Sequence, residues 1–218
     1  MTSRTRLIAT AAVAATLALG GCKTKGDIVV DEGVGIAAVR GACPAVGIPD
    51  YTGDVTLFTT PGATDAGAID MTAAMTNVRS TCNDSGEKVY ATVGFDVQAR
   101  RTDATAARSV TLPYFVSVMR GGRAIVTKRV GNVTLNFAAG QARAQAHGEG
   151  GVHIDKAEAT LPPEIRDRLT RKRRAGDADA AVDPLGQPDV RAAVARATFE
   201  VLVGFQLDDK QLAYNATR

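Results

Sequence analysis

The chain has 218 residues, of which 45% are hydrophobic and 22% are charged, and its mean hydropathy is close to zero. These values exclude an intrinsically disordered chain and a multi-span membrane protein, and the length suits one large domain. The formal charge of +3, from 26 basic and 23 acidic residues, raises the question of a nucleic-acid partner.

A short basic and apolar segment at the N-terminus predicts export. Arg4 and Arg6 precede an uncharged run over residues 7–21, which is shorter than the roughly 20 residues that cross a bilayer and is typical of a secretory signal. Removing these two of the 26 basic residues leaves 24, against 23 acidic residues. A mature chain near +1 does not support a nucleic-acid-binding protein.

The cysteine that follows this run indicates a lipid anchor. The sequence Leu19-Gly20-Gly21-Cys22 resembles the lipobox of bacterial lipoproteins. The resemblance implies a signal peptide over residues 1–21, acylation of Cys22 by chains such as palmitate, and a lipidated, glycine-rich tether over residues 22–42. Lys23 in place of Asp implies, by the same resemblance, sorting to the outer membrane. An ordinary cleaved signal with a coincidental cysteine is the alternative.

The two remaining cysteines predict a disulfide. If Cys22 carries lipid, Cys43 and Cys82 are left as a pair, and an exported protein meets an oxidising compartment. The bond would close a loop of about 40 residues and stabilise the fold by roughly 4 kcal/mol in the chain-entropy model. Two free buried thiols are the alternative.

From residue 43 onward, short segments alternate apolar and polar residues with period two, which predicts β-strands. The clearest segment covers residues 88–101. Further segments are 55–58, 69–82, 108–120, 123–130, 133–137, 152–154 and 197–207. A phase slip at Asn77 predicts a bulge in the second of these, and Pro113 predicts an edge or a bend in the third. Gly121-Gly122 predicts a hairpin turn before the segment 123–130. We expect one mainly β domain over residues 43–218, an antiparallel β-sandwich of immunoglobulin-like or fibronectin-III-like type; a partly closed barrel is the alternative.

Two short helices are expected in an insertion at about residues 162–197. The first covers residues 164–174, and the second covers residues 190–196 after a cap at Asp189. Each helix carries two aliphatic residues on one face, namely Ile165 and Leu169 on the first and Val190 and Val194 on the second.

The first of these helices is the best candidate for a binding surface. It carries six basic side chains: Arg166, Arg168, Arg171, Lys172, Arg173 and Arg174. Because guanidinium groups grip phosphates and carboxylates in a bidentate manner, we expect an anionic lipid or an acidic face of an envelope protein as the partner. The alternative is a solvated helix whose apolar side packs on the sandwich.

The only two histidines form a weaker candidate. His147 and His153 flank Glu149, in a segment where residues 147–151 are predicted to form a glycine-rich loop. Imidazole and carboxylate groups suit zinc or copper, and such a loop could close around one ion. A third dedicated ligand is not evident, so a solvated loop is the alternative and no metal or cofactor is assigned.

Catalytic signatures do not stand out. GxSxG, HExxH and GxxxxGK[ST] motifs are absent from the sequence, and a GxGxxA-like stretch at residues 33–38 lacks room for the helix that its dinucleotide-binding role needs. We therefore expect a protein that is not an enzyme. An envelope hydrolase stays open, because two catalytic carboxylates need not be close in sequence.

The lipobox, the sandwich pattern, Val110-Thr111-Leu112-Pro113-Tyr114 and the ending Tyr214-Asn215-Ala216-Thr217-Arg218 together resemble a family of alphaproteobacterial lipoproteins over the whole chain. That resemblance implies export and carries no activity. We expect an outer-membrane-anchored periplasmic lipoprotein, a structural or accessory binding subunit of the cell envelope. A small-ligand or metal-binding envelope module is the alternative, and an envelope hydrolase is a further alternative after it.

Overall fold

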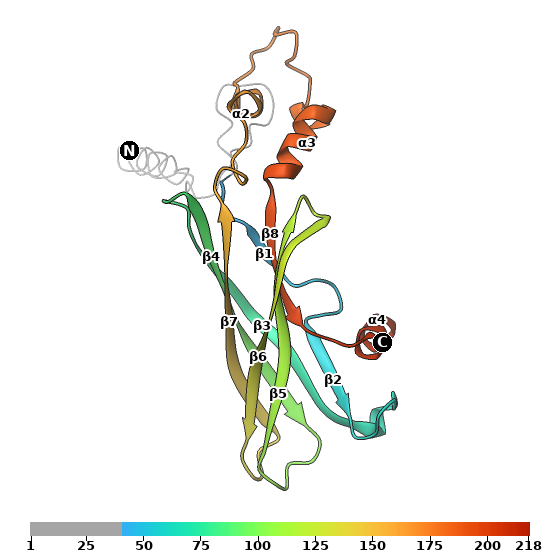
Figure 1. Cartoon of the computed structure of the whole chain (residues 1–218). Helices are drawn as coiled ribbons and strands as arrows, with labels where there is room; N and C mark the ends of the chain where they lie inside the picture. Colours follow the sequence, from blue (N-terminus) through green and yellow to red (C-terminus); the bar gives the residue numbers. More distant parts are fainter. Residues whose placement is uncertain (1–40) are drawn as a thin grey trace, which may run out of the picture.

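The alternating segments form eight strands in the computed structural model, which describes residues 41–218 (Figure 1). The strands are β1 (Ala45–Gly47), β2 (Asp54–Phe58), β3 (Ile69–Asn83), β4 (Lys88–Arg101), β5 (Arg108–Arg120), β6 (Ala124–Phe137), β7 (Arg143–Asp155) and β8 (Phe199–Phe205). The expected signal peptide, the lipidated Cys22 and the tether up to residue 40 lie outside the described residues.

The strands build two four-stranded sheets that pack face to face. One sheet has the order β1-β8-β5-β6 and the other has the order β2-β3-β4-β7. All pairs are antiparallel except β1 with β8, which is parallel. The prediction of a mainly β, antiparallel sandwich is confirmed. Three consecutive strands, β2 to β4, lie side by side in one sheet, whereas an immunoglobulin sandwich places its second and third strands in opposite sheets.

The core lies between the sheets and is built from the inward side chains of the alternating strands. Phe95 on β4, Phe205 on β8 and Leu135 on β6 are among its largest fully buried members. The bulge expected in β3 is confirmed: Asn77 has a φ of 53°, and the register with β4 shifts beside it. The edge expected at Pro113 is also confirmed, because β8 pairs with β5 only from Tyr114 onward.

Two turn predictions have different outcomes. The hairpin at Gly121 and Gly122 is confirmed, with φ values of 63° and 70° that glycine adopts without strain. The glycine-rich loop expected over residues 147–151 is wrong, because these residues pair with β4 in the middle of β7. The segments 123–130 and 133–137, which were expected as separate strands, are the single strand β6.

The insertion between β7 and β8 lies at one end of the sandwich and holds α2 (Pro163–Thr170), the short helix η2 (Pro184–Gly186) and α3 (Pro188–Ala197) (Figure 1). The aliphatic faces of α2 and α3 meet each other in a cluster of their own, formed by Ile165, Leu169, Val190, Ala193 and Val194. This corrects the alternative in which the apolar side of α2 packs on the sandwich.

The helix boundaries also differ from those expected. The first helix ends at Thr170 and not at residue 174, and Gln187 rather than Asp189 is the N-cap of α3. A third helix, α4 (Asp209–Thr217), begins with a capping box between Asp208 and Gln211 and packs beside β2. No helix within residues 41–218 is long and apolar enough to span a membrane.

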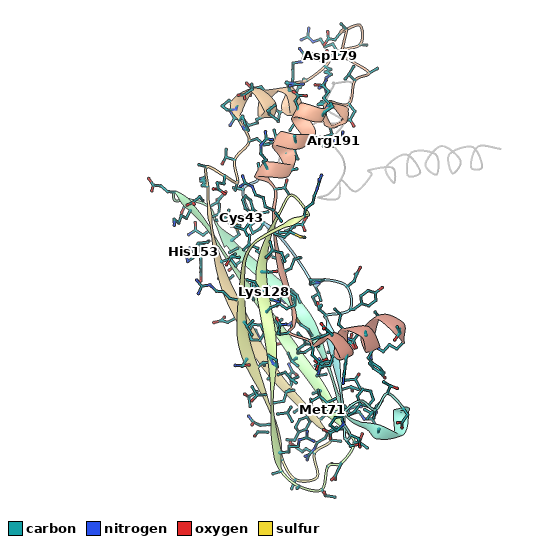
Figure 2. The ribbon with its side chains drawn as sticks, turned by 45° about the vertical axis from the view of Figure 1, so that its right-hand side comes forward. Cys43, Met71, Lys128, His153, Asp179 and Arg191 are labelled. Atoms are coloured by element: carbon teal, nitrogen blue, oxygen red, sulfur yellow. A yellow bond between two sulfur atoms is a disulfide. The ribbon has the colours of Figure 1, made fainter. Side chains whose placement is uncertain are left out.

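The disulfide between Cys43 and Cys82 is confirmed, with 6.0 Å between the two Cα atoms. Cys43 precedes β1 in one sheet, and Cys82 lies near the end of β3 in the other. The bond therefore joins the two sheets, near the end of the sandwich that carries the helical insertion (Figure 2).

Candidate functional site

The basic segment lies partly on α2 and partly in the extended chain after it. Arg173 is only 6% exposed, and its guanidinium donates a 3.1 Å hydrogen bond to the backbone carbonyl of Arg168. The backbone becomes extended at Arg171, where α2 ends, and the Arg173 side chain supplies a donor for a carbonyl of the last helical turn.

Acidic side chains of the same insertion neutralise much of this segment. The Asp179 carboxylate accepts hydrogen bonds from both Arg171 and Arg173. Arg168 donates to Asp189 at 2.5 Å, and this hydrogen bond lowers the pKa of Asp189 below its ordinary value. These ion pairs hold the insertion together and leave fewer guanidinium groups for an outside anion.

The remaining members of the segment lie at its surface. Arg166 is 3.8 Å from the neighbouring Asp167, with both side chains more than half exposed. The backbone N–H of Arg174 bonds to the carboxylate of Asp177. Lys172 lies in the same extended stretch after α2. The six basic residues thus do not form one open helix face. Arg168, Arg171 and Arg173 hold the insertion together, whereas the other three are exposed.

The two histidines do not come together. His147, Glu149 and His153 occupy alternate positions of β7 and share its outer face, where six residues of strand separate the two imidazoles by about 20 Å. Closure of a loop around one ion, which the sequence left open for these side chains, does not apply to residues that lie on one continuous strand. Among residues 41–218, no group of three or more His, Cys, Asp or Glu side chains is placed to hold a metal ion.

Each histidine has a local partner on β4 instead. The Nδ1 atom of His147 lies 3.1 Å from the Asp96 carboxylate. Hydrogen bonds from Asn77 and from His147 lower the pKa of Asp96. The ring of His153 packs against that of Tyr90, with 4.7 Å between the ring centroids.

The glycines of β7 allow this strand to lie against large side chains. A Cβ atom on Gly148 would lie 2.4 Å from the ring of Phe95, and one on Gly150 would lie 2.7 Å from Val116. On the outer face, a Cβ atom on Gly151 would lie 2.8 Å from the hydroxyl of Tyr90. Glycine is used here for close approach within a strand and not for a turn.

A groove of about 610 Å³ opens between β6 and β7, the edge strands of opposite sheets. We call it the edge groove; it is lined by Val126, Thr127 and residues 129–131 of β6, residues 149–153 of β7, and the side chains of Tyr90, Tyr114 and Val116. In Figure 2, Lys128 of β6 and His153 of β7 mark the two strands in the half of the sandwich nearer the insertion.

Tyr114 spans the two sheets within the edge groove. Its hydroxyl donates a 2.7 Å hydrogen bond to the backbone carbonyl of Glu149 on β7. Gly131 on β6 makes room for this side chain, because a Cβ atom there would lie 2.6 Å from the tyrosine ring. The two edges are therefore held at a fixed separation at this point.

The β6 side of the edge groove is apolar and cationic. Val126 is 56% exposed and Val130 is 58% exposed. A register shift leaves Val126 without a cross-strand partner on β5. Arg129 pairs with Val116 in the β5–β6 register, so its side chain points toward the groove, and no ion pair holds it within the described chain. A ligand with aliphatic groups and a negative charge complements this wall.

The sequence carries one signal for this site. That signal is the adjacent aliphatic pair Ile125 and Val126, which interrupts the alternation of β6. In the structure, both residues are more than half exposed. Their position beside β7 depends on how the two sheets pack, which the local pattern does not specify.

Comparison of the chain with protein-family models, with curated proteins and with solved structures finds no match.

Proposed function

We propose that the protein is a non-catalytic binding subunit of the cell envelope, anchored through Cys22 to the periplasmic face of the outer membrane. Its role is to hold an extended segment of a partner protein in the edge groove. The observation that carries this proposal is the pair of free strand edges facing each other across a groove with exposed valines on its rim.

Strand addition is the binding mode that this geometry supports. An edge strand presents backbone N–H and C=O groups in a row, and an extended peptide can pair with those that are free. On β7 the Glu149 carbonyl is already bonded to Tyr114, so β6 offers the longer continuous edge. Val126 and Val130 would contact alternate aliphatic side chains of that peptide, while Arg129 would pair with an acidic one. The partner segment is therefore an apolar, acidic β-strand.

Site-specific photocrosslinking in intact cells tests the binding site. A photoreactive residue at Thr127 lies in the edge groove, whereas one at Asn132 lies on the same strand outside it. We expect a crosslink to one polypeptide from position 127 only, mapped to an extended apolar and acidic segment. Equal crosslinking from both positions, or none from position 127, would contradict the proposal.

A variant that keeps the fold adds a second criterion. Val126→Asp with Val130→Asp places two charges on the exposed rim and should abolish the crosslink without unfolding the protein. Val182→Asp is the matched control, since Val182 is an exposed valine of the insertion, 43% exposed, that does not line the edge groove. A crosslink that survives the double variant would exclude the rim as the binding surface.

The anchor is tested separately. Metabolic labelling with an alkynyl palmitate analogue should mark the wild-type protein and should leave Cys22→Ser unmarked. Fractionation should then find the wild type with the outer membrane and the variant in the soluble periplasmic fraction. A labelled Cys22→Ser variant would rule out acylation at this cysteine.

A further inference from the structure

A second hollow lies on the outer face of the other half of the sandwich, away from the edge groove. It is a shallow trough of about 780 Å³ over β3, β4 and β7. Two rows of residues cross these strands: Thr72, Arg100 and Arg143 in one, and Ala74, Gln98 and Gln145 in the next. Small residues on β3 and long polar side chains on β4 and β7 give the trough its shape.

The two arginines are a cross-strand pair of like charge. Arg100 and Arg143 lie directly opposite each other in the β4–β7 register, and both are exposed. Like charges in this position destabilise a sheet. Neither guanidinium takes part in an ion pair within residues 41–218. The carboxylate of Asp54 at the rim of the trough is already paired with Arg218.

The trough therefore offers two uncompensated cations beside uncharged hydrogen-bonding groups. Two adjacent guanidinium groups can hold one carboxylate with several charge-assisted hydrogen bonds. The amides of Gln98 and Gln145 each provide donors and acceptors, which suit the hydroxyl groups of a sugar ring. The polar area extends about 10 Å across three strands and about 7 Å along them.

We infer that this trough is a binding site for a carboxylated saccharide. Arg100 and Arg143 hold the carboxylate, and Gln98 and Gln145 hold hydroxyl groups of the same or the next sugar unit. The site does not share residues with the edge groove, so the protein can engage a glycan on one face while a partner protein occupies the other.

Calorimetric titration of the full chain with a galacturonic acid trimer tests the inference. We expect saturable binding that weakens at least tenfold in Arg100→Gln/Arg143→Gln and several-fold in Gln98→Ala/Gln145→Ala. Arg79→Gln is the matched control, since Arg79 is an exposed arginine farther along β3 that does not line the trough; this variant should bind as the wild type does. A neutral galactose trimer should bind at least tenfold more weakly.

Four results would overturn the inference. The first is no binding of the acidic trimer to the folded wild type, and the second is an equal loss in Arg79→Gln, which would indicate general surface attraction. The third is binding to vesicles of anionic phospholipid, lost in the double arginine variant, without saccharide binding. Unchanged affinity in the double glutamine variant would also contradict it, because the site would then recognise the charge alone. Circular dichroism and thermal unfolding verify that each variant is folded.

Discussion

The hydroxyl of Tyr114 on β5 donates a 2.7 Å hydrogen bond to the backbone carbonyl of Glu149 on β7, so that one sheet is bonded to the edge of the other. Removing this hydroxyl in Tyr114→Phe leaves a partly buried carbonyl without its donor. We expect the free energy of unfolding to fall by about 1 kcal/mol, measured by urea denaturation. Binding in the edge groove should weaken as well, because the separation of the two edges is no longer fixed.

Tyr90→Phe is the matched control for this prediction. The Tyr90 side chain packs against Gly151 and His153, and the residue is 44% exposed. Loss of its hydroxyl should change the stability by less than about 0.5 kcal/mol. Equal effects of the two substitutions would show that the bond to Glu149 contributes nothing specific.

The close approach of Gly148 to Phe95 leads to a prediction about the core. A Cβ atom at position 148 would lie 2.4 Å from the ring of Phe95, which is fully buried, so the ring or the strand would have to shift. Gly148→Ala should therefore lower the free energy of unfolding by about 1–3 kcal/mol. Gly186→Ala serves as the control, because a Cβ atom there meets nothing within 4 Å.

A double variant identifies the cause of that loss. Phe95→Leu shortens the side chain beneath residue 148 and should recover part of the stability of Gly148→Ala in a double-mutant cycle. Additive losses from the two substitutions would mean that the glycine serves the backbone of β7 and not the ring.

Features that depend on local chemistry could be predicted from the sequence. The alternation around Phe95 places β4, the paired glycines at 121 and 122 place a hairpin, and the phase slip places the bulge at Asn77. In each case, neighbouring residues alone determine the backbone. The disulfide was predictable for a different reason, because once Cys22 is set aside only one pair of cysteines is left.

Features that depend on distant partners could not be predicted. The glycines of β7 resemble a loop until the ring of Phe95, more than 50 positions earlier, is placed beneath Gly148. Arg101 is 3% exposed and donates to carbonyls of Ala104, Ala138 and Gln141, two of which lie more than 35 residues away. The candidate sites belong to this class, since both hollows are formed by strands from separate parts of the chain.

The disulfide between Cys43 and Cys82 should provide a large share of the stability. It joins positions 39 residues apart in sequence and links the two sheets. In the chain-entropy model, Cys43→Ala/Cys82→Ala lowers the free energy of unfolding by roughly 4 kcal/mol. Reduction of the wild type should give the same loss in urea denaturation, and a reduced protein as stable as the oxidised one would refute this role.

The pair formed by Asp70 and Arg108 predicts how stability depends on pH. Both carboxylate oxygens accept hydrogen bonds of 2.7 Å from the guanidinium, which lowers the pKa of Asp70 below its ordinary value of 3.8. Because the folded-state pKa is the lower one, this carboxylate stabilises the fold above pH 3.8, and that contribution is lost as the pH falls through the folded-state pKa.

Asp70→Asn should therefore lower the free energy of unfolding by up to about 1 kcal/mol at pH 7, and the difference from wild type should shrink below pH 3.8. Asp155→Asn is the control, since the contact of Asp155 with Lys88 is 3.8 Å long and exposed; this variant should change the stability at pH 7 by less than about 0.5 kcal/mol. A deficit in Asp70→Asn that stays constant from pH 7 to pH 2 would assign the loss to packing rather than to charge.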